Sequence, residues 1–540
     1  MYKMKLSFVL ILVMISGIVA AQSLQDGKKF LYQQRFASAK SAMEKVVAAA
    51  PTNPESIYWL AQVLFEMKDV NGAKEVLRKG MEGANGSNPL LLVAMGQAEL
   101  AEKKPNDARQ RFETAISLTK GKDVAVYAAI GKANLEDGGD AAYGIEKLKA
   151  ATLVKNFKDA MVHVYMGDLY RKIMDGGGAV SSYENALLVD PKLAIAKYKI
   201  GKIYLTQGNE QRDIFLQKFN DAIADDATFT PVLYDMYVYY FSRDVVKATD
   251  FFNRYKVNTD PGPALDYEEA SLQFAGGDFK NAITKSDALL GSQGANADPR
   301  LYRLKAYSYD KLGDSIQALS LLEVFFQKAK PEQINPDNYV IAAYNAAKQK
   351  ADPAKIDYYF SKSIETDTLV ANKIDYAKKA ADFFKKSGST VKSAEWLTKI
   401  LTINPKMSKV DLYNAGFENF KATQYQLADS IFSVYKTQFP NEVYGHYWSF
   451  RSRSVIDSTM EQGLAIADCE KFISIAELDK AKNKSTLITA FGYLAGYSAN
   501  IKKDLATAKS YLEKIIEIDP TNQDAIKNRD IIDKALAAKK

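Results

Sequence analysis

The residue types that most often carry chemistry are scarce in this chain of 540 residues. It contains two histidines, His163 and His446, and one cysteine, Cys469. None of them lies near another at the spacing of a metal-ligand motif, and a single cysteine has no partner for an intramolecular disulfide. We therefore expect no metal site, no cofactor and no disulfide.

Two short patterns are similar to pieces of known active sites. Residues 175–178 (DGGG) lack both the Lys-Ser/Thr that follows a phosphate-binding loop and the strand that precedes it. This run therefore predicts a turn between two helices. Ser-x-x-Lys starts at Ser117, Ser308, Ser389 and Ser433, but the Ser-Asp-Asn and Lys-Thr-Gly elements of penicillin-binding enzymes are missing.

Other catalytic signatures are also missing from the sequence. It has no His-Glu-x-x-His, no Gly-x-Ser-x-Gly and no dinucleotide-binding fingerprint. A pair of carboxylates, as in glycosidases, has no sequence signature, so this class stays open by motif, but no feature favours it. We predict no catalytic residues and no enzymatic activity.

The charge distribution bears on the class of partner. The formal net charge is +7, and acidic and basic residues are interspersed along the chain. A nucleic-acid binder would concentrate its basic residues on one face. We therefore expect no nucleic-acid partner.

A recurring spacing of small residues predicts where the helices lie. A small residue inside one expected helix is followed twelve positions later by another, and often by proline twelve positions beyond that. The clearest copy is Gly167, Ala179, Tyr183, Ala186 and Pro191. The small residues expected at helix crossings are Gly96, Ala108, Gly167, Ala179, Gly201, Ala306, Ala318, Gly416, Ala428, Gly496 and Ala508.

Packing explains this spacing. Two antiparallel helices of about 12 residues approach closely only where their side chains are small. We therefore expect Gly167 to face Ala179, and Tyr183 to fill the groove toward the next helix pair. Pro191 cannot continue a helix and begins the next turn.

The repeated pattern resembles the tetratricopeptide repeat (TPR) family, whose period is about 34 residues. The resemblance covers most of residues 23–520. It implies an all-α fold, a right-handed α-solenoid of stacked antiparallel helix pairs that forms a TPR-like superhelix. It also implies that the protein binds other macromolecules and is not itself catalytic.

The first residues are typical of a signal peptide. Lys3 and Lys5 precede an apolar run over residues 6–15, and small residues follow at 19–21. We expect a signal peptide over residues 1–21, cleaved after Ala21. The alternative is an uncleaved anchor, but the apolar run is shorter than the ~20 residues that a spanning helix needs.

The leader resembles those of Gram-negative bacteria, especially Bacteroidetes. It implies a periplasmic or cell-surface protein that associates with the outer membrane, without direct insertion after cleavage. We divide the rest into an N-terminal array (22–290), a C-terminal array (291–520) that is separate or continuous with the first, and a capping helix (521–540). The run GSQGANAD at 291–298 marks the boundary.

In this family the first helices of successive pairs line a concave surface, and the residue three positions before the central small residue points there. Tyrosine offers flat apolar area and a hydroxyl, which suits a binding groove. The alternative role of such a tyrosine is packing between neighbouring helices. The candidate partner-binding residues are Tyr58, Tyr198, Tyr267, Arg303, Tyr339, Tyr413 and Tyr493.

We therefore predict an exported scaffold or adaptor that binds proteins or peptides through a concave, partly aromatic groove. An envelope, secretion or motility complex is the expected setting. The alternative is a glycan-binding surface protein with TPR-like helices. The absence of a lipid-attachment cysteine after the leader and the regularity of the repeats count against that alternative.

Overall fold

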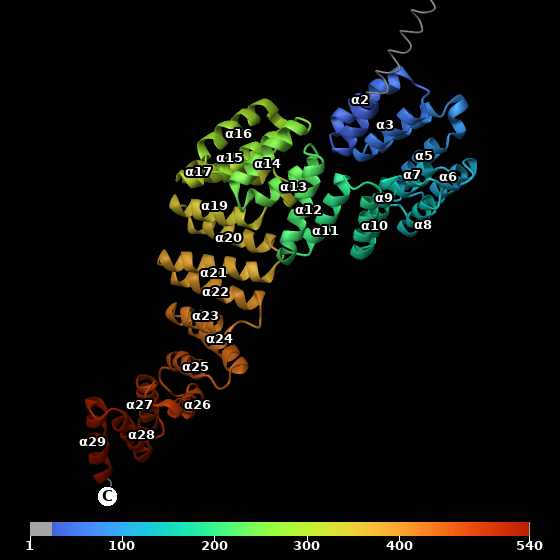
Figure 1. Cartoon of the computed structure of the whole chain (residues 1–540). Helices are drawn as coiled ribbons and strands as arrows, with labels where there is room; N and C mark the ends of the chain where they lie inside the picture. The colour runs from blue at the N-terminus through green and yellow to red at the C-terminus, as the bar shows by residue number, and fades with distance from the viewer. Residues whose placement is uncertain (1–23, 539–540) are drawn as a thin grey trace, which may run out of the picture. The chain divides into compact units, whose positions relative to one another are not determined.

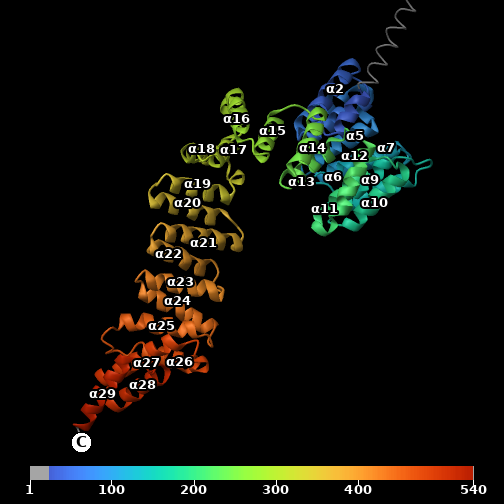
Figure 2. The ribbon, with the colours of Figure 1, turned by 60° about the vertical axis from the view of Figure 1, so that its left-hand side comes forward.

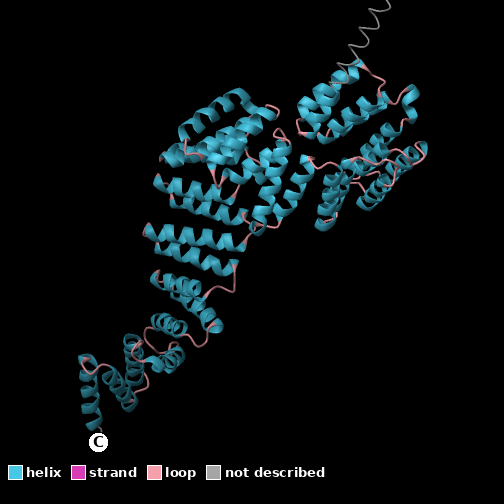
Figure 3. Ribbon diagram, viewed as in Figure 1, coloured by secondary structure: helices cyan, strands magenta, loops and turns pink. Residues whose placement is uncertain are grey.

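The computed structural model describes residues 24–538, and within this range all regular structure is helical (Figure 3). The chain divides into two compact units, the first ending at Ala297 and the second beginning at Asp298. In both units the helices pack mainly on their neighbours in sequence. These observations confirm the predicted all-α fold of stacked helix pairs. The predicted signal peptide lies outside the described residues.

The described part of the first unit begins with a helical stretch at 24–32, and its last α-helix is α16 (Figure 1). Short 3-10 turns, η1 (Gly83–Ser87), η2 (Asn209–Gln211) and η3 (Gly294–Asn296), lie between some of its helices. The helices are α2 (Phe36–Ala49), α3 (Pro54–Glu66), α4 (Val70–Gly80), α5 (Pro89–Ala101), α6 (Pro105–Leu118), α7 (Val124–Ala133), α8 (Ala141–Thr152), α9 (Ala160–Lys172), α10 (Gly176–Val189), α11 (Ala194–Thr206), α12 (Arg212–Asp225), α13 (Thr230–Phe241), α14 (Val245–Asn258), α15 (Pro263–Ala275) and α16 (Phe279–Gln293).

The second unit stacks its helix pairs in chain order, as α19 to α24 show plainly in Figure 2. It contains two further 3-10 turns, η4 (Pro331–Gln333) and η5 (Glu477–Asp479). Its helices are α17 (Arg300–Leu312), α18 (Ser315–Lys328), α19 (Pro336–Lys348), α20 (Pro353–Thr366), α21 (Val370–Lys386), α22 (Thr390–Ile403), α23 (Lys409–Lys421), α24 (Tyr425–Gln438), α25 (Val443–Ile456), α26 (Ile466–Ala476), α27 (Lys484–Asn500), α28 (Leu505–Ile518) and α29 (Gln523–Ala537).

Local capping explains where many helices begin. The side chain of Asn53 accepts hydrogen bonds from the main-chain N–H groups at the start of α3, which also has proline at its first position. The run at 175–178 starts α10, because the carboxylate of Asp175 accepts from the N–H of Gly178 at 2.8 Å. Only Asp175 therefore lies in the predicted turn between α9 and α10, whereas Gly176, Gly177 and Gly178 already form the first turn of α10.

The predicted small residues lie at the helix crossings, with one difference in what they face. A β-carbon added to Gly167 would lie 2.4 Å from the ring of Tyr183, so this ring, not Ala179 alone, covers the glycine. Gly96, Gly201 and Gly416 are covered in the same way by the phenylalanine sixteen or eighteen positions later. The predicted alanines are fully buried: Ala108, Ala179, Ala306, Ala318, Ala428 and Ala508.

Gly496 is the exception, and its predicted packing role is wrong. A β-carbon there would meet only the methyl group of Met460, at 3.9 Å. Leu512 stands sixteen positions later, where Gly96, Gly167 and Gly416 have an aromatic ring. The result is an open groove of about 580 Å³ that Gly496 lines together with residues of α28 and α29.

A buried polar cluster joins α24, α25 and α26. The carboxylate of Asp468 lies 2.6 Å from Lys436 Nζ and 2.9 Å from Arg453. Arg453 also pairs with Asp429 at 3.0 Å, and His446 Nδ1 lies 3.4 Å from Asp468. Charged groups therefore hold these helices together at a place where other pairs rely on apolar packing.

Candidate binding cavity

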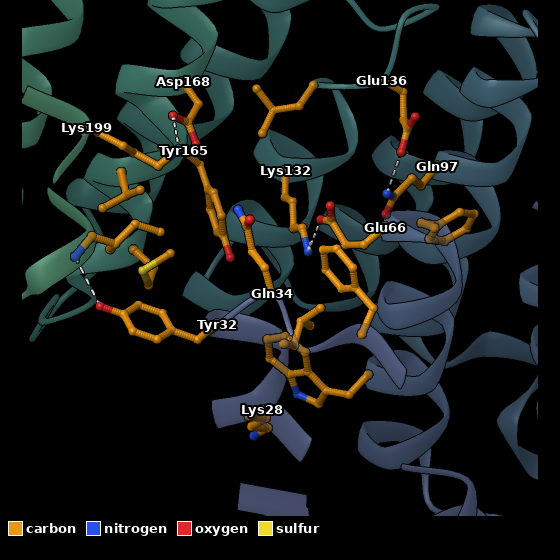
Figure 4. Close-up of a pocket in the computed structure, with 18 of the residues that line it drawn as sticks. Lys28, Tyr32, Gln34, Glu66, Gln97, Lys132, Glu136, Tyr165, Asp168 and Lys199 are labelled. Carbon is orange, nitrogen blue, oxygen red and sulfur yellow. Dashed lines mark hydrogen bonds and ion pairs between the residues drawn. The ribbon is translucent and has the colours of Figure 1, made fainter. Parts of the chain in front are cut away.

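The first unit contains a cavity of about 480 Å³ that is open on one side to solvent (Figure 4). Its walls come from α3, α5, α7, α9 and α11, the first helices of successive pairs, and from the chain before α2. Aromatic, apolar, acidic and basic side chains all contribute to its surface. The lining residues are Lys28, Leu31, Tyr32, Gln34, Phe36, Trp59, Phe65, Glu66, Lys68, Gln97, Lys132, Leu135, Glu136, Met161, Val164, Tyr165, Asp168, Ile195 and Lys199.

Most lining residues from the helices occupy fixed positions relative to the small residue of their repeat. Trp59, Tyr165 and Lys199 stand two positions before it. Gln97, Lys132 and Asp168 stand one position after it, and Glu66 and Glu136 five positions after it. These positions fall on one side of an α-helix, because each residue turns by about 100°. The repeat therefore builds the cavity wall from equivalent positions.

Hydrogen bonds link the inner helices along this wall. Gln62 donates to Gln97 at 2.8 Å, and Gln97 donates to Glu136 at 3.0 Å. Lys132 pairs with Glu66 at 3.3 Å and so joins α7 to α3. The wall is thus a connected polar surface.

A second ion pair lies on the α9–α11 side of the cavity. Lys199 Nζ is 2.7 Å from the carboxylate of Asp168, which also accepts a hydrogen bond from the hydroxyl of Tyr183 at 2.7 Å. Burial raises the pKa of the Tyr183 phenol above its ordinary value, and the charge of Asp168 raises it further. The Asp168 carboxylate is therefore committed to protein partners.

The N-terminal segment, residues 28–38, forms one side of the cavity and contacts residues far along the chain. The main-chain N–H of Ile195 donates to the hydroxyl of Tyr32 at 3.1 Å, and the Tyr32 ring lies 4.9 Å from that of Phe229. Gln33 donates to the hydroxyl of Thr228 at 2.7 Å, and Thr230 donates to the carbonyl of Gln33. These contacts attach the N-terminal segment to α11 and to the turn before α13.

Asp260, from the connection between α14 and α15, holds the other end of the N-terminal segment. Its carboxylate accepts from the N–H groups of Ala37 at 2.8 Å and Ser38 at 3.2 Å, and it lies 3.6 Å from Arg35. These are the first-turn N–H groups of α2, which has no side-chain cap of its own. A residue more than two hundred positions away therefore caps α2.

The predicted partner-binding residues do not line this cavity. In the first unit, Tyr58 and Tyr267 are buried among packed helices, and the hydroxyl of Tyr198 donates to Asp235 at 2.9 Å. Their placement agrees with the packing role weighed as the alternative, and a role in binding stays a prediction.

The other predicted residues belong to the second unit. Tyr339 stacks on Phe326 with ring centroids 4.4 Å apart, and Tyr413 stacks on Phe417 at 5.7 Å. Tyr493 lies edge-on to Phe450 at 5.1 Å. The guanidinium Nη1 of Arg303 donates to the carbonyl of Gln333 at 3.3 Å. These four also pack within the repeats, and their role in partner binding stays untested.

The sequence contains a usable signal for the cavity, but the predicted position is one residue out of phase. The position three before the small residue supplies only Val164 to the wall, whereas Trp59 and Tyr165 stand two before it. Lys132, one position after the small residue, also lines the cavity and was not predicted. The contribution of the N-terminal segment had no sequence signal, because it depends on contacts across some 160 to 220 residues.

The side chains that line the cavity are suited to binding a ligand. Within residues 24–538, no three His, Cys, Asp or Glu side chains lie together in a way that could hold a metal ion. No described helix combines the length and the apolar character needed to cross a bilayer. A cavity of this size that mixes apolar walls with a few directed polar groups is typical of a ligand site.

Comparison with known proteins relates both ends of the chain to repeat families. Residues 33–115 match the family model described as anaphase-promoting complex, cyclosome, subunit 3, and residues 493–522 match the tetratricopeptide repeat model. A TPR repeat-containing protein of Methanocaldococcus jannaschii is 28% identical over 193 residues, which are 32% of this chain and 33% of that protein. The chain thus spans about a third of the length of this curated relative.

Two solved structures are also similar. The C-terminal part of a TPR repeat-containing protein from Cytophaga hutchinsonii is 24% identical and covers 48% of this chain and 98% of its own, with a TM-score of 0.30. A thermophilic TPR protein from Thermus thermophilus is 16% identical and covers 44% of this chain and 98% of its own, with a TM-score of 0.24. The helix pairs and their small-residue crossings are those of a stacked repeat fold, and residues 493–522 match the tetratricopeptide repeat model.

Proposed function

We propose that this protein is a scaffold that binds a segment of a partner protein in the cavity of its first unit. The observation that carries the proposal is the wall built from equivalent positions of five inner helices, which combines Trp59, Phe65 and Tyr165 with charged and amide groups. Aromatic side chains supply contact area at low entropic cost, and fixed polar groups supply orientation. A surface of this composition suits a peptide segment.

Site-specific photo-crosslinking tests the proposal. A benzophenone amino acid replaces Trp59 in the cavity or, as the matched control, Tyr358, an exposed aromatic residue of the second unit. Cells are irradiated, and adducts are identified by mass spectrometry. We expect position 59 to give an adduct with one defined protein that position 358 does not give. Equal adducts at both positions, or none at position 59, would contradict the proposal.

We also propose that the protein is exported and acts in an envelope, secretion or motility complex. The support is the leader, with Lys3 and Lys5 before the apolar residues 6–15 and small residues at 19–21. Sequencing the N-terminus of the protein purified from its own cells is the direct check. A chain that begins at Gln22 supports export, and one that still begins at Met1 contradicts it.

We do not propose the glycan-binding alternative, because no observation on the described residues favours it over a protein partner. The absence of enzymatic activity also remains a proposal, in keeping with a repeat family that typically binds.

A further inference from the structure

Three polar side chains of the cavity wall make no hydrogen bond or ion pair with another described residue. They are the phenol of Tyr165 on α9, the amide of Gln34 in the N-terminal segment, and the ammonium of Lys68 after α3. The other side-chain charges on this wall have partners, such as Glu66 with Lys132. The wall therefore has polar groups to spare at a few defined points.

Tyr165 is suited to hydrogen bonding in its neutral form. Burial raises the pKa of its phenol well above the ordinary value, and the nearby Asp168 and Glu66 raise it further. A neutral phenol both donates and accepts, and the amide of Gln34 does so as well. Figure 4 shows both side chains directed into the cavity. A peptide group, with one N–H and one C=O, matches this pair of groups.

Apolar side chains also contribute to this wall. Trp59 and Phe65 line the cavity from α3, and Leu135 lines it from the chain just after α7. The volume of about 480 Å³ falls within the usual range of ligand cavities. A short extended segment with one large apolar side chain fits both the composition and the size.

We infer that the N-terminal segment is part of the binding site, because it supplies Gln34 opposite α9. In this arrangement, Tyr165 and Gln34 bond one peptide group of the partner, and Trp59, Phe65 and Leu135 surround an apolar side chain next to it. Docking of the segment onto Asp260 is then required for binding. This inference rests on the proposed function, since it names the feature of the partner that the cavity recognises.

Fluorine NMR of the full chain labelled with 5-fluorotryptophan tests the inference. The chain has three tryptophans, of which Trp59 lies in the cavity while Trp396 and Trp448 belong to the second unit. The probes are acetyl-Ala-Leu-Ala-amide, acetyl-Ala-Gly-Ala-amide and maltose. We expect a saturable shift of the Trp59 resonance with the leucine peptide and a much weaker one with the glycine peptide, while the other two resonances stay in place.

Four variants then separate the contributions. Tyr165→Phe and Gln34→Ala each remove one hydrogen bond and should weaken binding of the leucine peptide by about fivefold to tenfold. Asp260 lies outside the cavity lining, and Asp260→Ala frees the end of the N-terminal segment next to Gln34 while Tyr32 and Gln33 keep their contacts; it should weaken binding by a similar factor. Tyr170→Phe, five positions along α9 and absent from the cavity wall, is the matched control and should bind as the wild type does.

The outcomes are distinct. Unchanged affinity in Tyr165→Phe and Gln34→Ala would overturn the inference while leaving a protein ligand in the cavity. A saturable Trp59 shift with maltose, and none with the peptides, would overturn both the inference and the proposed function. If no probe moves the Trp59 resonance but position 59 still crosslinks to a partner, the proposed function stands and the short-peptide inference fails.

Discussion

Gly167 in the first unit and Gly496 in the second occupy the same position in their repeats but have different surroundings. The ring of Tyr183 would lie 2.4 Å from a β-carbon at Gly167, whereas a β-carbon at Gly496 would meet only Met460 at 3.9 Å. Near the open crossing, the buried cluster around Asp468 holds α24, α25 and α26 together through charges. The same spacing of small residues thus gives a helix pair in both places. The side chain on the second helix that faces the glycine determines how closely the crossing is packed.

The largest expected change in stability comes from removing the carboxylate of Asp468, the centre of the charged cluster. Asp468→Ala leaves the largely buried ammonium of Lys436 without a carboxylate partner, while Arg453 keeps only Asp429. We expect the free energy of unfolding to fall by about 3 kcal/mol or more, because uncompensated buried charges are costly. Urea unfolding of the full chain measures it. The control Asp375→Ala removes an exposed carboxylate that pairs with Lys379, and it should cost less than about 0.5 kcal/mol.

The pH dependence of stability also tests the contribution of the Asp468 cluster. Burial raises the pKa of Asp468, but hydrogen bonds from His446 and Lys436 and the charges of Lys436 and Arg453 outweigh it, so that the pKa falls from 3.8 to about 2. A carboxylate whose pKa is lower in the folded state stabilises the fold above pH 4, and this stability is lost as the pH falls toward 2. We expect the wild type to lose about 2 kcal/mol more than Asp468→Asn between pH 5 and pH 2. Parallel acid-unfolding curves for the two proteins would contradict this.

Gly167→Ala tests the filled crossing. The added methyl group meets the buried ring of Tyr183, whose hydroxyl is held by Asp168. Overpacking of a core costs about 1 to 3 kcal/mol, and the better helix propensity of alanine returns up to about 1 kcal/mol. We therefore expect a net loss of about 1 to 2 kcal/mol in urea unfolding. An unchanged or higher stability would show that Tyr183 can move aside without cost.

Gly496→Ala is the matched change at the open crossing and has the smallest expected effect. Space is available for the methyl group, so the gain in helix propensity should appear as an increase of about 0.5 to 1 kcal/mol in stability. The comparison fails if this variant is destabilised as much as Gly167→Ala.

The sequence predicted the helices and most crossings because those depend on local spacing. Gly96, Gly167, Gly201 and Gly416 are each covered by a ring sixteen or eighteen positions later, a distance within one repeat. The open crossing at Gly496 was missed, since the pattern treats Leu512 as equivalent to Tyr183.

The cavity could be predicted only in part. Its helical wall follows the repeat, but reading the groove one residue out of phase rotates the chosen positions by about 100° and selects packing tyrosines such as Tyr58. The contacts of the N-terminal segment through Asp260 and Tyr32 depend on the rotation between successive helix pairs. Small rotations add up over many repeats, and no short pattern encodes their sum.

The affinity of the partner identified by crosslinking from position 59 tests the central claim most directly. It should be measured with the wild type, with Trp59→Ala in the cavity, and with Tyr344→Ala, a partly exposed aromatic residue on α19 of the second unit. We predict at least about tenfold weaker binding for Trp59→Ala, since buried aromatic contacts dominate such interfaces, and no change for Tyr344→Ala. Unchanged affinity for Trp59→Ala, with a loss for Tyr344→Ala, would contradict the account.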